Sequence, residues 1–156
     1  MTGVPLTPLP GRVGQVLPGE GAVVTHRPDL PRASVTVENT SAWPVVITSH
    51  FHFFEANRLL RFDRGAAFGM HLDVMAGGSE RFEPGESREV ALVGYAGDRA
   101  VFGFNGLTDC VLGVGAEFER QRDRALDRAH AAGFLDTATK GRTSGPTTSG
   151  PTTSGE

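Results

Sequence analysis

The feature that most constrains this fold is a series of short segments with strand-like patterns, separated by turn residues. Residues 34–38 (SVTVE) alternate apolar and polar side chains with the period of two that is typical of a half-buried strand. Turn signals such as Pro84-Gly85 separate further expected strands, at residues 45–54, 80–83, 89–95 and 100–105. Short strands with turns about every ten residues favour an all-β fold, either a sandwich or a partly open barrel.

Aromatic side chains are concentrated in the same part of the chain. Eight of the ten phenylalanines lie between Phe51 and Phe104. Because each buried ring covers a large apolar area, we expect these rings to fill the space between packed β layers.

One segment near the C-terminal end has the pattern of a helix. Residues 117–132 mix acidic and basic side chains, and pairs such as Glu119 and Arg122 are spaced to meet on one helical face. Gly133 stands where a helix would end. A narrow apolar stripe at helical spacing predicts a helix that docks on another surface, through Phe118, Ala125, Leu126 and Ala129.

Composition divides the chain into four parts. The last residues repeat SGPTT and contain no apolar side chains, so burial cannot offset the entropy of ordering them. We therefore expect a flexible N-terminal extension (1–15), a β domain (16–113), a helical C-terminal extension (114–136) and a disordered tail (137–156).

Charge and hydropathy exclude several classes of protein. The chain has 15 basic and 18 acidic side chains, a formal charge of −3, and no basic stripe that would indicate nucleic-acid binding. No apolar run approaches the roughly 20 residues of a membrane-spanning helix. A single cysteine, Cys110, and the lack of a secretory signal pattern favour a cytoplasmic protein.

The sharpest candidate for chemistry is the pair His50 and His52. On an unbroken strand, residues two apart share a face, so both imidazoles could reach one metal ion, as in half of a cupin site. Glu55, however, would point to the opposite side of such a strand, and no histidine lies between His71 and His130 to complete the ligand set. The pattern therefore favours imidazoles that hydrogen-bond to backbone or carboxylate groups.

Nucleophilic catalysis has less support in the sequence. Cys110 precedes an apolar pair, a context in which a lone cysteine is usually a packing residue. Neither a G-x-S-x-G motif nor a phosphate-binding loop occurs. We predict no catalytic, cofactor-binding or metal-ligating residue in this chain, which favours a subunit or binding role.

Several motifs in fixed order resemble the β subunit of bacterial urease. The motif of residues 49–57 (SHFHFFEAN) is the longest of them. The likeness covers about residues 16–107 and includes LPGE at 17–20, VTVENT at 35–40, LRFDR at 60–64, RFEPGE at 81–86 and FGFNG at 102–106.

This resemblance implies a role in the hydrolysis of urea to ammonia and carbamate. In ureases the two nickel ions and their carbamylated lysine belong to the large α subunit, a TIM-barrel protein. The β subunit is a clip-like or jelly-roll-like chain that supports α and γ subunits, in an assembly expected to be (αβγ)₃. On that pattern, none of the residues of this chain is a nickel ligand.

Two alternatives from other classes remain at this point. The first is a stand-alone cupin-like metal enzyme that uses His50 and His52. The second is a β-sandwich binding module that has no catalytic partner.

Overall fold

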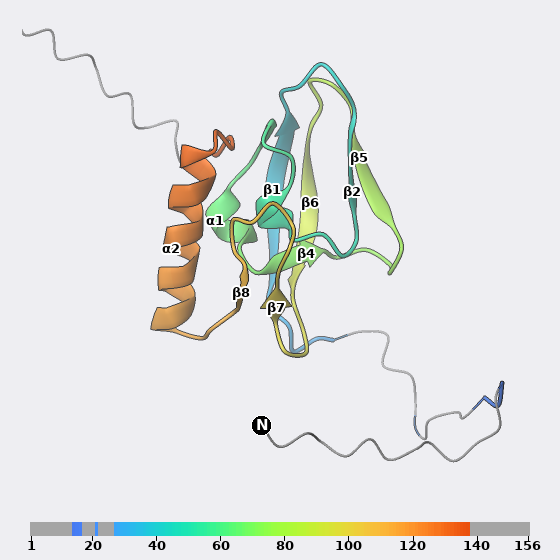
Figure 1. Cartoon of the computed structure of the whole chain (residues 1–156). Helices are drawn as coiled ribbons and strands as arrows, with labels where there is room; N and C mark the ends of the chain where they lie inside the picture. Colours follow the sequence, from blue (N-terminus) through green and yellow to red (C-terminus); the bar gives the residue numbers. More distant parts are fainter. Residues whose placement is uncertain (1–13, 17–20, 22–26, 138–156) are drawn as a thin grey trace, which may run out of the picture.

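The computed structural model describes residues 14–16, 21 and 27–137. Figure 1 shows strands curled into an open, half-barrel arrangement with one long helix along its side. The elements follow in the order β1 (Arg32–Asn39), β2 (Val45–Thr48), the 3₁₀ helix η1 (Phe53–Glu55), β3 (Leu60–Arg61), α1 (Arg64–Ala67), β4 (Met70–Leu72), β5 (Ser79–Phe82), β6 (Ser87–Gly94), β7 (Ala100–Val101), β8 (Cys110–Val111) and α2 (Ala116–Ala131).

The largest sheet has the strand order β3-β1-β6-β4, and all its pairs are antiparallel. β1 and β6 form its centre, with Arg32 opposite Val93 at one end and Glu38 opposite Ser87 at the other. Val35 and Val37 are buried and their neighbours Ser34 and Thr36 are exposed, so the predicted alternation in β1 is confirmed.

A two-stranded sheet, β2-β5, covers the other side of the core, and β7 and β8 form a second small pair. Between the layers lies a cluster of buried apolar side chains, which includes Phe53, Phe62 and Phe82. This arrangement confirms an all-β, incomplete barrel with a C-terminal helix, and phenylalanine fills its interior as predicted.

The prediction of one strand over residues 45–54 is wrong in its second half. β2 ends at Thr48, a turn follows, and residues 53–55 form η1. The expected strand at 100–105 is likewise shorter, because β7 ends at Val101. Three strands and a short helix were not predicted at all, namely β3, β4, β8 and α1.

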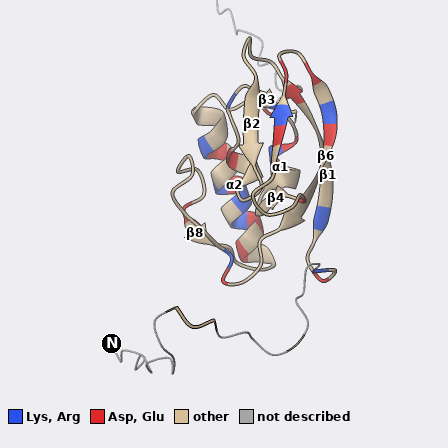
Figure 2. Cartoon of the chain, turned by 90° about the vertical axis from the view of Figure 1, so that its right-hand side faces the viewer, with Lys and Arg blue, Asp and Glu red and all other residues tan. Residues whose placement is uncertain are grey.

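Helix α2 agrees with its prediction. Glu119 pairs with Arg122, and Gly133 has φ +76°, the left-handed conformation that ends a helix. Ala125 and Ala129 face a second apolar cluster with Phe54, Phe68 and Leu112. Figure 2 shows that acidic and basic residues are mixed along the ribbons of α2 and of the β1–β6 region.

The predicted N-terminal extension (1–15) and tail (137–156) lie outside the described residues, apart from residues 14–15 and Thr137. The limits of the four parts therefore stay predictions. Within the described part of the chain, no helix is long and apolar enough to cross a bilayer.

Candidate functional site

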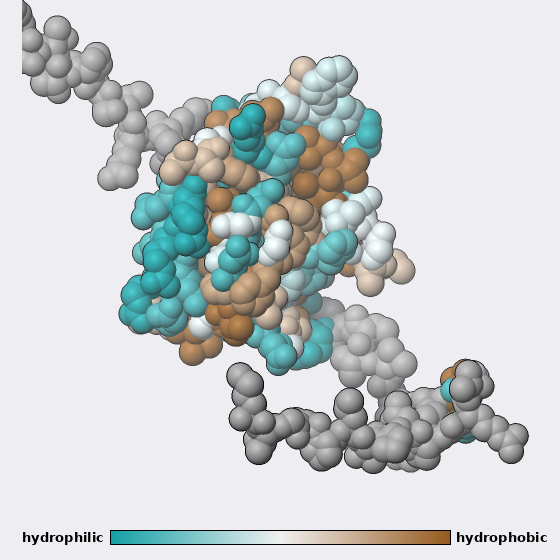
Figure 3. Space-filling view, in the orientation of Figure 1, coloured by the Kyte–Doolittle hydropathy of each residue, from teal (hydrophilic) through white to brown (hydrophobic). Residues whose placement is uncertain are grey.

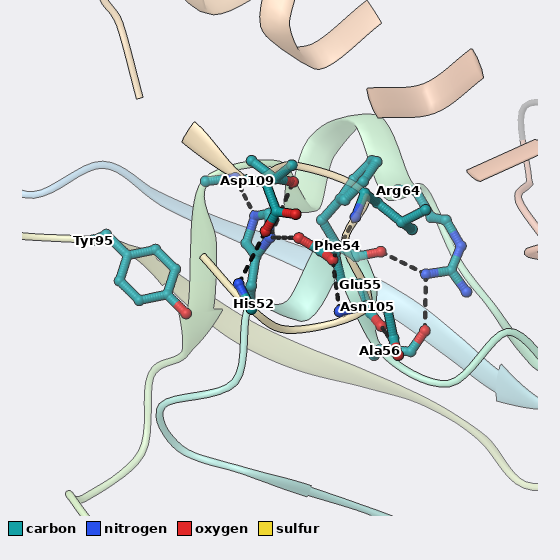
Figure 4. A network of polar contacts seen from close by, with 12 residues as sticks. His52, Phe54, Glu55, Ala56, Arg64, Tyr95, Asn105 and Asp109 are labelled. Carbon is teal, nitrogen blue, oxygen red and sulfur yellow. Dashed lines mark hydrogen bonds and ion pairs between the residues drawn. The ribbon is translucent and has the colours of Figure 1, made fainter. Parts of the chain in front are cut away.

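A cluster of buried polar groups surrounds His52 and Glu55. The 3₁₀ helix η1 places these side chains three residues apart on one face, and both are almost completely buried. His52 Nδ1 and Glu55 Oε1 are 3.0 Å apart (Figure 4). On an unbroken strand Glu55 would point away from His52; that expectation is wrong, because the chain forms a helical turn here and the two side chains meet.

The other carboxylate oxygen of Glu55 holds the loop that follows β7. The backbone N–H groups of Asn105 and Leu107 both donate to Oε2 at 2.9 Å. Burial raises the pKa of Glu55, but hydrogen bonds from His52, Leu107 and Thr108 oppose burial and together hold the pKa below its usual value. Glu55 is therefore an ionised acceptor that joins η1 to the 105–107 loop.

Both ring nitrogens of His52 are engaged within the chain. The Gly69 N–H donates to Nε2 at 2.9 Å, so a neutral imidazole carries its proton on Nδ1 and donates it toward Glu55. Thr108 Oγ1 also lies 3.4 Å from Nδ1. Since neither nitrogen has a lone pair directed at open space, His52 fits a structural hydrogen-bonding role.

The structure does not bring His50 and His52 together on one strand face. His50 lies in the exposed turn after β2, and its carbonyl accepts a hydrogen bond from Tyr95 Oη at 2.7 Å. Across residues 14–16, 21 and 27–137, no three His, Cys, Asp or Glu side chains are grouped closely enough to hold a metal ion. The donor set of this region therefore does not fit a nickel pair.

Cys110 is partly exposed on β8 and packs against the second apolar cluster. Burial is the main cause that raises the pKa of its thiol. A raised pKa lowers the thiolate fraction near neutral pH, which fits the predicted packing role better than nucleophilic chemistry.

Arg64 is a buried polar residue whose role the sequence did not indicate. Its guanidinium lies over the rings of Phe62 and Phe134, at 4.3 and 4.9 Å from their centroids. It donates five hydrogen bonds of 2.6 to 3.2 Å to carbonyl oxygens, those of Phe54, Ala56, Asn57, Leu60 and Leu135 (Figure 4).

The C-terminal segment closes over Arg64. Asp136 forms a parallel bridge with Phe62, and its carboxylate accepts from the Arg64 backbone N–H at 3.4 Å and lies 3.1 Å from His130 Nε2. Burial lowers the pKa of Arg64 to about 10, and the Asp136 charge opposes that effect. Arg64 thus ties the segment that follows α2 to the β domain.

In the His52–Glu55 network and the Arg64 network, the polar groups hydrogen-bond to other groups of this chain. In the described part of the chain, no buried side-chain nitrogen or oxygen lacks a hydrogen-bond partner. A hydrogen-bonded network of this kind makes one arrangement of the loops rigid.

Comparison with known proteins gives one consistent result. The family model described as urease beta subunit matches residues 13–111. "Urease subunit beta 2" of Brucella abortus (strain 2308) is 47% identical over 114 residues, which is 72% of each chain. "Urease subunit beta" of Haloarcula marismortui is 45% identical over 134 residues, 86% of this chain and 92% of the relative.

A third relative is longer. "Urease subunit gamma/beta" of Streptomyces avermitilis is 47% identical over 131 residues, which cover 82% of this chain and 55% of that protein. The matches span most of the β domain, including the motifs that carry His52, Glu55 and Arg64. The chain therefore belongs to the urease beta subunit family.

Proposed function

We propose that this chain is the structural, non-catalytic β subunit of a nickel-dependent urease, which hydrolyses urea to ammonia and carbamate. The observation that carries the proposal is the family match over residues 13–111, together with identities of 45 and 47% to urease β subunits. The two buried networks support it, because their polar groups hold loops and the segment after α2 rather than a reactive centre.

The catalytic groups, in this proposal, belong to a partner α subunit. Two nickel ions held by that subunit would supply a nucleophile near neutral pH, because the cations stabilise hydroxide. This chain, in the proposal, has a structural role. Its Glu55 and Arg64 networks hold the surface that contacts the α subunit in one conformation. A surface that is already ordered loses less entropy on association.

The proposed partners are urease α and γ subunits, in an assembly built from αβγ units and expected to be (αβγ)₃ in the cytoplasm. The Streptomyces avermitilis relative, whose name joins gamma and beta, supports a close association of β with γ. A second relative of this kind, from Streptomyces coelicolor, is 49% identical over 124 residues.

Co-expression tests the proposal. The chain is produced with candidate α and γ chains and nickel-delivery proteins, and the product is sized and assayed for ammonia release from urea. We expect one stable, nickel-containing complex with activity, and no activity from the chain alone. Ureolysis by the isolated chain, or no association with the large chain, would contradict the assignment.

Metal analysis separates this proposal from the alternative of a stand-alone cupin-like enzyme using His50 and His52. The isolated chain is incubated with nickel, zinc, iron or manganese and then desalted. Stoichiometric metal that is lost on His50→Ala would favour the alternative. We expect no stoichiometric metal in either protein, because both ring nitrogens of His52 already have partners.

A further inference from the structure

The two-stranded sheet formed by β2 and β5 has an open edge along β2. Among the described residues, β2 pairs with β5 alone, with Val45 opposite Phe82 and Thr48 opposite Ser79. The backbone N–H of Ser49 donates to Gly78 O at 2.9 Å, which makes residues 49 and 78 a hydrogen-bonded pair. Because such pairs alternate in an antiparallel ladder, the N–H and C=O of Val46 point away from β5.

A groove runs beside this edge. It has a volume of about 460 Å³, and its walls are β2 on one side and residues near Asn57, Arg58 and Phe134 on the other. Side chains on the β2 side are apolar, and Figure 3 shows hydrophobic surface in the area where β2 lies in Figure 1. The groove thus combines outward-facing backbone groups with an apolar wall along β2 and polar side chains opposite it.

Two large apolar side chains are exposed on or just before β2. Val46 is 51% exposed, and Trp43, three residues earlier, is 77% exposed. Exposed aromatic and apolar side chains beside a free sheet edge are typical of a surface that another chain covers, since such an edge otherwise promotes aggregation.

Arg58 places a positive charge at the groove. Its side chain is exposed, and its guanidinium has no hydrogen-bond or ion-pair partner among the residues that the structure describes. The Arg58 backbone is fixed, because its carbonyl accepts a hydrogen bond from Leu135 N–H at 2.9 Å. A cation on a fixed backbone at the groove wall favours an occupant that carries a carboxylate.

We propose that the β2 edge docks an extended, acidic and apolar segment of the large urease subunit, which adds a strand beside β2. The outward-facing N–H and C=O of Val46 would hydrogen-bond to a segment with an extended backbone. The exposed side chains of Val46 and Trp43 favour apolar side chains in that segment, and Arg58 favours a carboxylate. The inference rests on the proposed function, because it names the surface through which this chain supports the large subunit.

The central experiment replaces one outward-facing amide. Val46→Pro removes an N–H that the β2-β5 ladder does not use and places a ring in the path of an added strand. The matched control is Arg81→Pro, because Arg81 is opposite Val46 and its N–H points away from the same ladder, at the other edge. Circular dichroism and thermal unfolding of both variants establish that each one folds.

We expect Val46→Pro to weaken association with the co-expressed α and γ chains by about tenfold or more, and Arg81→Pro to leave it nearly unchanged. Arg58→Glu should weaken association by a similar factor, with a smaller effect in high salt. Hydrogen exchange of the peptide that contains residues 45–48 should slow when the wild-type chain enters the complex.

The outcomes distinguish this inference from the proposed function. If the wild-type chain does not associate with the large subunit, the proposed function fails. If it associates, and Val46→Pro associates equally well with no slowed exchange at residues 45–48, only the docking surface is wrong. Two other results would assign the edge to another occupant and overturn the inference. One is exchange at residues 45–48 that is already slow in the isolated monomer, and the other is a dimer of this chain that Val46→Pro dissociates.

Discussion

His52 and Glu55 form a buried pair in which Nδ1 of the imidazole lies 3.0 Å from Oε1 of the carboxylate. Glu55 also accepts from two backbone N–H groups, and His52 accepts from a third. The Glu55 carboxylate and the His52 imidazole therefore fix η1, the loop after β7 and the backbone at Gly69 relative to each other. The motif of residues 49–57 thus holds three segments of this chain together.

Replacement of Glu55 should be among the most destabilising single changes. In Glu55→Ala, the N–H groups of Asn105 and Leu107 and the His52 ring all lose their acceptor in a buried place. We expect the free energy of unfolding to fall by about 3–5 kcal/mol, measured by urea denaturation. The control is Glu83→Ala, which removes an exposed ion pair with Arg81 and should cost less than about 1 kcal/mol.

Acidification should weaken the same pair. The pKa of Glu55 in the folded chain is below its ordinary value, so its stabilisation is complete above the unfolded-state pKa of about 4.3. That stabilisation is lost as the pH falls from there through the lower pKa of the folded state. Urea denaturation of the wild-type chain between pH 7 and pH 3 should show the decrease.

Glu55→Gln is the matched variant for this pH dependence. Its amide does not titrate, so the variant should be less stable than the wild type near neutral pH and lose less stability on acidification. Equal slopes for the two proteins below pH 4.3 would show that other carboxylates control acid unfolding.

The C-terminal segment should be necessary for the stability of the β domain. A chain that ends at Ala132 lacks the Phe134 ring and the Leu135 carbonyl that cover Arg64. We expect the free energy of unfolding to fall by about 3 kcal/mol or more, because a buried cation loses part of its partners. The control ends at Thr137, keeps every contact described for Arg64, and should match the full-length chain in thermal unfolding.

Arg64→Lys tests the geometry of the same site. Lysine keeps the positive charge but offers three donors instead of a planar fork, while the arginine donates five hydrogen bonds. We therefore expect a loss of about 2 kcal/mol or more even in this conservative variant. Wild-type stability for Arg64→Lys would show that charge alone is sufficient.

Replacement of Gly69 by alanine should destabilise the fold more than the same replacement at Gly77, whose φ is similar. Gly69 has φ +74°, and an added Cβ would lie 3.1 Å from Leu112 Cδ1 and from Phe118 Cε2. Gly77 has φ +82° and open space around it. Gly77→Ala should cost about 1 kcal/mol from backbone strain, and Gly69→Ala at least about 1 kcal/mol more. Calorimetric unfolding of both variants gives the difference, and equal costs would show that the neighbours move freely.

Sequence periodicity found the elements whose pattern is local. The alternation of β1 and the charge pairs of α2 are properties of neighbouring residues, so both elements appear where they were predicted. It failed for β3 and β8, which have two residues each, and it predicted β7 too long. Elements that short have no period, and their pairing partners determine them.

The sequence by itself determined the family, the all-β class and the docked helix, because these depend on motifs and on side-chain periods along the chain. Only the tertiary structure decided what His52 does, since its partners Glu55, Gly69 and Thr108 meet through a helical turn and two distant loops. The burial of Arg64 likewise depends on Leu135, 71 residues away. Contacts at such separations arise from packing, which local pattern does not encode.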